Sequence, residues 1–184
     1  YSIRNPTNVV SATGMEIGSL NTPPQLMNTG LSDLNDLNGD GLPDVLMTDF
    51  GGGSHRTYLN LGESTLAGSR FLRWTNAGDV GGDTEPRGLS LGSTAVHLSD
   101  MDGDGLADFV VNPGSDVPYY FRNSGRTAWQ PKQNMAADPP FPPSPFGTPG
   151  VRTADLDFDK RMDLIQSVST GSGFDYSVWF NLGN

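Results

Sequence analysis

The sequence predicts an all-β protein built from repeated antiparallel units, and three observations support that prediction. An acidic pattern of nine residues recurs three times along the 184 residues. A short apolar run follows each copy, and an aromatic segment ending in a shared Asn-containing signature comes next. Gly (24 residues) and Pro (14) are abundant, and no long stretch has apolar residues at helical spacing. This combination favours short strands joined by turns.

The acidic pattern places oxygen-bearing side chains at its first, third, fifth and ninth positions. Its copies span residues 36–44, 100–108 and 155–163, called here the first, second and third loops. Alternating carboxylates before a sharp turn can surround a hard cation such as Ca²⁺, which takes six to eight oxygen ligands. Without a cation, carboxylates held this close repel one another. The pattern therefore predicts metal loops within a repeat protein.

Short strands are expected on both sides of each loop. Apolar runs bounded by turn residues predict first strands near 30–32, 95–98 and 151–154, and second strands at 45–47, 109–111 and 164–165. A turn-rich gap and an aromatic third strand follow, with its Asn lying 24, 23 and 26 residues after the respective loop start. A fourth strand is expected at 71–74 and near Trp129.

Four antiparallel strands per repeat, with the metal loop between the first two, are typical of a β-propeller blade. We therefore expect one partial β-propeller domain over residues 1–184, with repeats at about 30–75, 93–130 and 150–184. Three blades are too few to close a propeller, which usually has four to eight. The chain is thus expected to be part of a larger propeller, or half of a dimeric one.

The remaining segments are assigned to connections. Residues 131–149 are rich in proline and are expected to form an inter-blade loop at the surface, although Phe141 and Phe146 offer an alternative role as a partner-binding arm. The third repeat ends before any outer strand. Residues 1–12 are one candidate source of that missing strand.

Charge and composition exclude several function classes. The net charge is −10, and 11 of the 21 acidic residues lie inside the three loops, so three bound Ca²⁺ ions would reduce it to −4. No basic patch is present, which argues against nucleic acid or an anionic membrane as partner. No apolar run approaches the length of a membrane span, and cysteine is absent, which excludes disulfides and thiolate metal sites.

The loops differ from the helical calcium motifs. An EF-hand needs a bidentate Glu at position 12, where this chain has Met47, Val111 and Gln166. Dockerin-type loops open in the same way but are followed by helices, whereas apolar strand-forming runs follow here. The ninth-position Asp is therefore expected to close each site.

The combination Asp-x-Asn/Asp-Gly-Asp-Gly-x-x-Asp, a strand, and then Tyr/Trp-Φ-Asn-Leu-Gly resembles the FG-GAP/VCBS repeats of integrin-α-like β-propellers. The resemblance covers roughly residues 30–184. The segments DLNGDGLPDVL, YLNLG and VWFNLGN look most like the propeller region of Tc-type toxin B components and Rhs-like secreted proteins.

The resemblance implies calcium ligands in all three loops, including a backbone carbonyl at position seven. The implied ligands are Asp36, Asn38, Asp40, Asp44 and the Leu42 carbonyl; Asp100, Asp102, Asp104, Asp108 and the Leu106 carbonyl; and Asp155, Asp157, Asp159, Asp163 and the Arg161 carbonyl. In the third loop Phe158 and Lys160 replace the two glycines, and Lys160 and Arg161 add positive charge. We expect two calcium sites and a third that is weaker or empty.

A structural role for the metal predicts a non-catalytic protein. The chain has two histidines, His55 and His97, and lacks a nucleophile elbow, a His-Glu-x-x-His motif and a phosphate-binding glycine loop. We expect a scaffold or protein-interaction module of a secreted, toxin-like protein, because weak calcium sites suit the extracellular space. Its partner is expected to be a protein or the remaining propeller blades. A lectin-type propeller that binds glycans through Trp74, Trp129 or Trp179, and a propeller-based polysaccharide lyase, are the alternatives.

Overall fold

The computed structural model describes residues 15–17, 30–50, 54–66, 69–80, 86, 88–114, 117–125, 129–138 and 146–183. Every regular element in these ranges is a strand. Among the same residues, no helix has the length and apolarity needed to cross a membrane. The predicted all-β class is therefore confirmed.

The first sheet has five strands in the order β1-β5-β4-β3-β2. They are β1 (Met15–Ile17), β2 (Ser32–Asn35), β3 (Asp44–Phe50), β4 (Ser54–Leu66) and β5 (Ser69–Val80). Strands β2 to β5 pair antiparallel, whereas β1 pairs parallel with β5. The predicted fourth strand at 71–74 therefore lies in the first half of a longer strand that ends at Val80.

The other two sheets have four antiparallel strands each. The second follows the chain as β6 (Val96–Ser99), β7 (Asp108–Val111), β8 (Tyr119–Asn123) and β9 (Trp129–Asn134). The third has the order β10-β13-β12-β11, from β10 (Ala136–Asp138), β11 (Val151–Ala154), β12 (Asp163–Ser169) and β13 (Phe174–Gly183). Each acidic loop joins the first two strands of a blade, as predicted.

Strand β10 corrects two expectations. It adds an outer strand to the third sheet by pairing with the end of β13, so that strand comes from the segment before the third repeat. Residues 131–134 belong to β9 and 136–138 to β10, so only part of the expected 131–149 loop can be a connection. Residues 1–12 and Phe141 lie outside the described residues.

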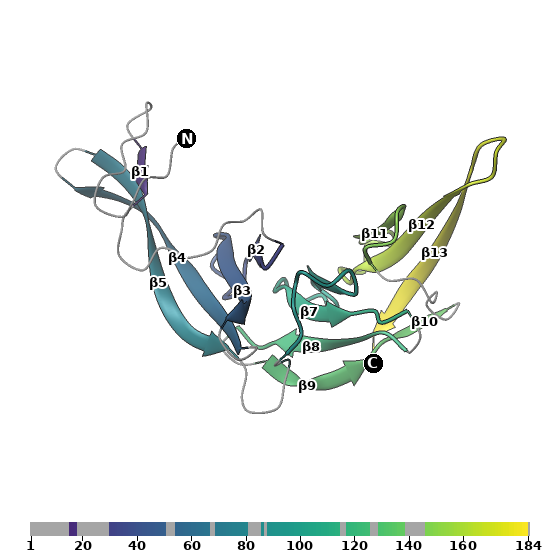
Figure 1. Ribbon diagram of the computed structural model, residues 1–184, viewed down its shortest axis with the longest axis horizontal. Coiled ribbons are helices and arrows are strands. Elements are labelled where there is room, and N and C mark those ends of the chain that lie inside the picture. Colours follow the sequence, from purple (N-terminus) through teal and green to yellow (C-terminus); the bar gives the residue numbers. More distant parts are fainter. Residues whose placement is uncertain are drawn as a thin grey trace.

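The three sheets lie side by side along an arc, as Figure 1 shows. Strands β2 and β11 lie on its inner side, and β5 and β9 on its outer side. This arrangement of four-stranded units is consistent with neighbouring blades of a β-propeller.

Side chains that point alternately to the two faces of the middle strands form the cores between the sheets. Successive side chains of a strand point to opposite faces. In β7, Phe109 and Val111 pack with Leu46 of the first sheet, whereas Val110 packs with Met101, Tyr120 and Met135 in a separate cluster. Strand β7 is thus covered on both faces, which is why its residues after Asp108 form a continuous apolar run.

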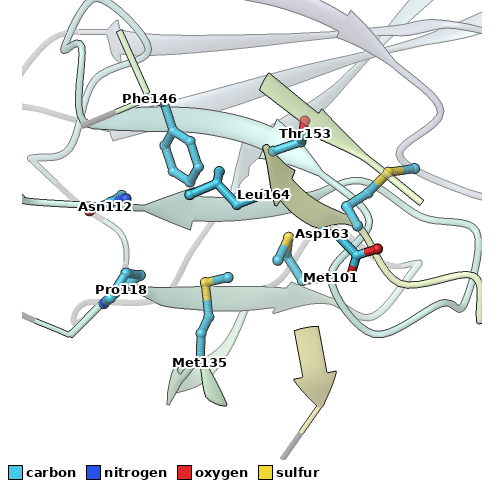
Figure 2. A pocket seen from close by; sticks show the side chains of 9 residues that line it. Met101, Asn112, Pro118, Met135, Phe146, Thr153, Asp163 and Leu164 are labelled. Carbon is cyan, nitrogen blue, oxygen red and sulfur yellow. The ribbon is translucent and has the colours of Figure 1, made fainter. Parts of the chain in front are cut away.

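The core between the second and third sheets is rich in methionine. Figure 2 shows Met101 of the second loop, Met135 between β9 and β10, Leu164 of β12 and Phe146 from the segment before β11 around a shared cavity. The volume of this cavity is about 10 Å³. Only about one water molecule would fit in so small a space. The second and third sheets are therefore closely packed. Because Phe146 packs in this core, it is not a free partner-binding side chain.

Candidate metal centre

The ninth-position Asp is the structural centre of each loop. Its carboxylate is buried in all three loops, with exposures of 0% for Asp44 and Asp108 and 1% for Asp163. One oxygen accepts the backbone N–H of the second loop residue, from Leu37 (3.0 Å), Met101 (2.9 Å) and Leu156 (2.8 Å) respectively. The other accepts the N–H of the third-strand Asn, from Asn60 (2.7 Å), Asn123 (2.8 Å) and Asn181 (2.9 Å). These bonds tie each loop to its own blade.

The first-position Asp holds the turn together. In the first loop, Asp36 accepts the N–H of Gly39 at 2.7 Å through Oδ1 and that of Gly41 at 2.8 Å through Oδ2. Asp100 accepts the equivalent bonds from Gly103 and Gly105, both at 2.8 Å. In the third loop the Oδ2 of Asp155 accepts the N–H of Lys160 at 3.1 Å, while its Oδ1 is buried without a donor.

Carboxylates gather closely in two of the three loops. Asp100, Asp102 and Asp108 offer oxygens within 4.8 Å of one another, as do Asp155, Asp157 and Asp159. The first loop forms no such acidic group among the described residues, because Asn38 holds the third position and its Nδ2 donates to Asp40 at 3.0 Å. Turning the Asn38 amide over would present its oxygen instead.

These groups fit a hard cation by their chemistry. Burial, together with the neighbouring carboxylates of Asp102 and Asp104, raises the pKa of Asp108 to about 7 against two opposing backbone hydrogen bonds. Burial also raises the pKa of Asp44 and of Asp102. A bound cation would reverse this effect by stabilising the charged form. The buried Oδ1 of Asp155 has the same need for a positive partner.

Two arginines partly neutralise the carboxylates of the second and third loops. Arg122 of β8 pairs with Asp102 and, at 3.0 Å, with Asp104 of the second loop. Arg161 of the third loop pairs with Asp159, and its Nε donates to the Asn181 carbonyl at 3.1 Å. The first loop has Leu42 where the third has Arg161, and Leu59 where the second blade has Arg122. The sequence indicated positive charge at Arg161, but nothing in its repeats indicated Arg122.

The third loop has the same positive-φ turn as the first two loops, although it lacks their glycines. Phe158 and Lys160 have φ of 65° and 76°, close to the 82° and 81° of Gly39 and Gly41. A non-glycine residue in this region costs about 1–2 kcal/mol. The sequence predicted that the third loop keeps the same turn at a conformational cost, and the positive φ values of Phe158 and Lys160 agree with that prediction. The relative metal affinities, and the carbonyl ligands at Leu42, Leu106 and Arg161, stay predictions.

The third-strand Asn connects neighbouring blades, a role that sequence reasoning did not assign. Asn123 Nδ2 donates to the Ala107 carbonyl of its own loop at 3.2 Å and to the Leu37 carbonyl of the first loop at 2.9 Å. Asn181 Nδ2 donates in the same way to the carbonyls of Met162 at 3.3 Å and Met101 at 2.9 Å.

A turn fixes the orientation of each of these Asn side chains. The Asn oxygen accepts the N–H of the glycine two residues later, from Gly62 (2.9 Å), Gly125 (3.0 Å) and Gly183 (3.0 Å). All three glycines have positive φ, between 69° and 73°. The recurring Asn-x-Gly signature was the signal of this connection, because it forms an Asx-type turn that aims the amide of Asn123 and of Asn181 at the preceding blade.

A backbone bond repeats beside each Asn contact. The N–H of the eighth loop residue donates to the first-residue carbonyl of the preceding loop, from Ala107 to Asp36 at 3.3 Å and from Met162 to Asp100 at 3.0 Å. The metal loops of adjacent blades are thus linked directly, at one end of the inter-sheet core.

These repeats match a known family. The chain matches the FG-GAP-like repeat over residues 36–111 and 100–165. The protein belongs to the FG-GAP-like repeat family. Each matched segment starts at the first position of one acidic loop and includes the next loop, so the matches contain the inter-blade bonds just described. No curated protein matches the chain significantly.

Three of the other residues considered for function, His55, Trp74 and Trp129, pack in the FG-GAP sheets. His55 is buried, donates from Nε2 to the Leu89 carbonyl at 2.7 Å and lies 4.9 Å from the Phe109 ring, and burial lowers its pKa. Trp129 packs edge-on against Phe109 at 5.7 Å, and Trp74 packs on the Val45 cluster. A core position gives these three side chains a packing role.

Proposed function

We propose that this protein is a non-catalytic, calcium-stabilised β-propeller scaffold that presents a surface to a protein partner. The observation that carries the proposal is the grouping of carboxylates in loops that are hydrogen-bonded to a neighbouring blade. A cation bound there would stabilise both the loop and the contact between blades. Asp100, Asp102 and Asp108, and Asp155, Asp157 and Asp159, are the grouped side chains that would hold it. In the first loop we propose Asp36, Asn38, Asp40 and Asp44 as the equivalent ligands.

Calcium suits this donor set better than the alternatives. Only oxygen atoms are available, which disfavours zinc and copper, and Ca²⁺ tolerates more ligands and less regular geometry than Mg²⁺. When bound, the ion supplies charge neutralisation and fixes the loop. The chain's own residues supply the connection to the preceding blade, through the third-strand Asn and the eighth-position N–H.

An extracellular location follows from the same proposal. Loops whose glycines are replaced, or whose acids are paired with Arg122 or Arg161, are expected to bind calcium weakly. Weak sites are filled where free Ca²⁺ is in the millimolar range, outside the cytosol. We propose a secreted protein of the toxin-associated type on this ground and on the segment resemblance, with a protein surface as partner.

The proposal is tested by thermal unfolding of the purified chain with Ca²⁺, with Mg²⁺ and with a chelator. Calcium at 100 times its dissociation constant should stabilise the fold by about 3 kcal/mol per occupied site, and Mg²⁺ should do less. Equal unfolding temperatures in all three solutions would exclude a calcium-stabilised scaffold. A glycan array and an assay on acidic polysaccharides would show binding or cleavage if one of the alternative functions were correct.

A further inference from the structure

The first loop has an amide, on Asn38, where the other two loops have the carboxylates of Asp102 and Asp157. Glycine follows this residue, and Asn38 and Gly39 form the only Asn-Gly pair in the chain. We propose that Asn38 is a site of spontaneous deamidation, which adds a carboxylate to the first loop. The modification needs no enzyme, cofactor or partner, and it consumes only water.

Deamidation at an Asn-Gly pair begins when the glycine nitrogen attacks the side-chain carbon of the Asn. A bond forms between the Gly39 nitrogen and Cγ of Asn38, and the bond from Cγ to Nδ2 breaks. The freed NH₂ group takes up a proton, which balances the one lost by Gly39, and leaves as ammonia. Water then opens the resulting succinimide ring at either carbonyl, which gives Asp or isoaspartate without oxidation or reduction. Glycine favours the first step because it has no side chain to obstruct the approach.

The hydrogen bonds of the first loop assist each part of this step. The Gly39 N–H donates to Asp36 Oδ1 at 2.7 Å, so a carboxylate stands ready to accept the proton that the attacking nitrogen loses. Asn38 Oδ1 accepts the N–H of Asp40 at 3.0 Å, and such a donor stabilises negative charge that develops on this oxygen during the attack. The departing Nδ2 donates to Asp40 Oδ2 at 3.0 Å, which orients the amide. Asn38 is half-buried and Gly39 is exposed, so water reaches the pair.

The loop conformation accommodates the Asp product, because the other two loops have Asp at the same position. Asp102 and Asp157 each accept the N–H of the residue two positions later at 3.2 Å, as Asn38 does at 3.0 Å. Both also belong to groups of three closely spaced acids, whereas the first loop forms no such group among the described residues. Deamidation would therefore give the first loop carboxylates at the same four positions as the second and third loops.

The added carboxylate changes how the first loop binds a cation. The number of charged ligands is one of the factors that set the calcium affinity of an oxygen site. The Asp product should therefore bind calcium several-fold more tightly than the unmodified loop, and calorimetric titration of Asn38→Asp measures this gain. This consequence rests on the proposed calcium binding, whereas the deamidation itself does not.

Peptide mass spectrometry of the folded chain, incubated with a chelator in mildly alkaline buffer, tests the proposal. The peptide that contains Asn38 should gain about 1 Da, the difference between an amide and a carboxylic acid. It should do so many-fold faster than the peptides that contain Asn123 and Asn181, which are buried and are followed by Ser and Leu. A parallel incubation in denaturant gives the rate without the loop's hydrogen bonds, and the folded chain should react within a few-fold of that rate.

The other two loops supply matched variants. Asp102→Asn creates a second Asn-Gly pair, in a loop where the Gly103 N–H donates to Asp100 at 2.8 Å, and this Asn should convert back to a carboxylate at a rate similar to that of Asn38. Asp157→Asn places an Asn before Phe158, whose side chain obstructs the attack, and it should remain an amide over the same period. The two variants thus separate the effect of the following residue from that of the loop.

Two outcomes would overturn the proposal: an Asn38 peptide that keeps its mass in the folded chain while it converts in denaturant, or equal conversion of the Asp102→Asn and Asp157→Asn variants. Calcium separates this proposal from the scaffold proposal. An ion held by Asp36 and Asn38 would engage both oxygens and should slow conversion several-fold relative to chelator. Conversion at equal rates in calcium and in chelator would support the modification and contradict calcium binding by the first loop.

Discussion

The first and third loops share a hydrogen-bond frame but differ in almost every residue that is not part of it. Both place a buried Asp between the second loop residue and the third-strand Asn. The first loop reaches this geometry with Gly39 and Gly41, and the third with Phe158 and Lys160 at positive φ. The comparison shows that the aspartates and the Asn set the conformation, whereas the glycines lower its cost.

The loops differ also in how they balance charge. In the third loop Arg161 pairs with Asp159, while the first loop has Leu42 there and replaces one acid by Asn38. The third loop therefore has four carboxylates offset by Lys160 and Arg161, whereas the first has three carboxylates and no cationic residue. We expect the first to depend more on calcium, and the third to bind calcium more weakly but to keep its shape without it.

Removing the ninth-position carboxylate should have the largest effect, and an equal one in both loops. Asp44→Ala and Asp163→Ala each leave two backbone N–H groups without an acceptor, at a cost of about 1–3 kcal/mol per buried group. Denaturant unfolding in chelator, where metal ligation plays no part, measures the loss. The exposed Asp175→Ala is the control, expected to change stability by less than about 0.5 kcal/mol. A large difference between the two loop variants would mean that the frame is not shared.

Calcium withdrawal should separate the two loops. On addition of chelator, hydrogen exchange at residues 37–42 should increase more than at residues 156–161, because Arg161 continues to neutralise Asp159. The overall loss is expected to be about 3 kcal/mol for each site filled at 100 times its dissociation constant. Equal deprotection of both loops would show that Arg161 does not substitute for the ion.

Exchanging the sixth-position residues should have opposite effects in the two loops. Lys160→Gly should stabilise the protein, and Gly41→Lys should destabilise it, by about 1–2 kcal/mol each. A Cβ at Gly41 meets no atom within 4 Å, so conformation rather than crowding sets the cost there. Paired urea unfolding curves measure both variants. A destabilising Lys160→Gly substitution would mean that this lysine contributes more through its contacts than it costs in backbone strain.

Exchanging the seventh-position residues should have the smallest effect. Arg161→Leu removes the internal cation and should raise the calcium affinity of the third loop a few-fold, whereas Leu42→Arg should lower that of the first. Ion pairs of this kind contribute at most about 1 kcal/mol, so larger changes are not expected. Calorimetric titration of each variant gives the affinities, and an unchanged third-loop affinity in Arg161→Leu would argue against competition between Arg161 and calcium.

Much of this comparison was accessible from the sequence. The acidic pattern located all three loops between the first two strands of a blade, because alternating acids and glycines restrict the backbone locally. The replacement of two glycines also identified the third loop as strained. Local spacing was sufficient for these features, since each depends on residues within one repeat.

Contacts between repeats were not accessible in the same way. The bonds from Asn123 to Leu37 and from Asn181 to Met101 span 86 and 80 residues, and nothing in the signature shows which carbonyl the amide reaches. The origin of the third sheet's outer strand in β10 was missed because residues 136–138 are too few to give a strand pattern. Arg122 lies at a position that is Leu59 and Phe180 in the other blades, so no repeat indicated its pairing with Asp102.

The most direct test of the account is a calorimetric calcium titration of the chelator-treated chain, with Asp100→Asn and Asp155→Asn as site-specific variants. The account predicts saturable binding at more than one site, with the third-loop site the weakest. Each variant should lose one binding step, and the loss in Asp155→Asn should be the weaker step. Absence of calcium-dependent heat, together with an unfolding temperature unchanged at several millimolar calcium, would contradict the claim that these aspartate loops exist to hold a divalent ion.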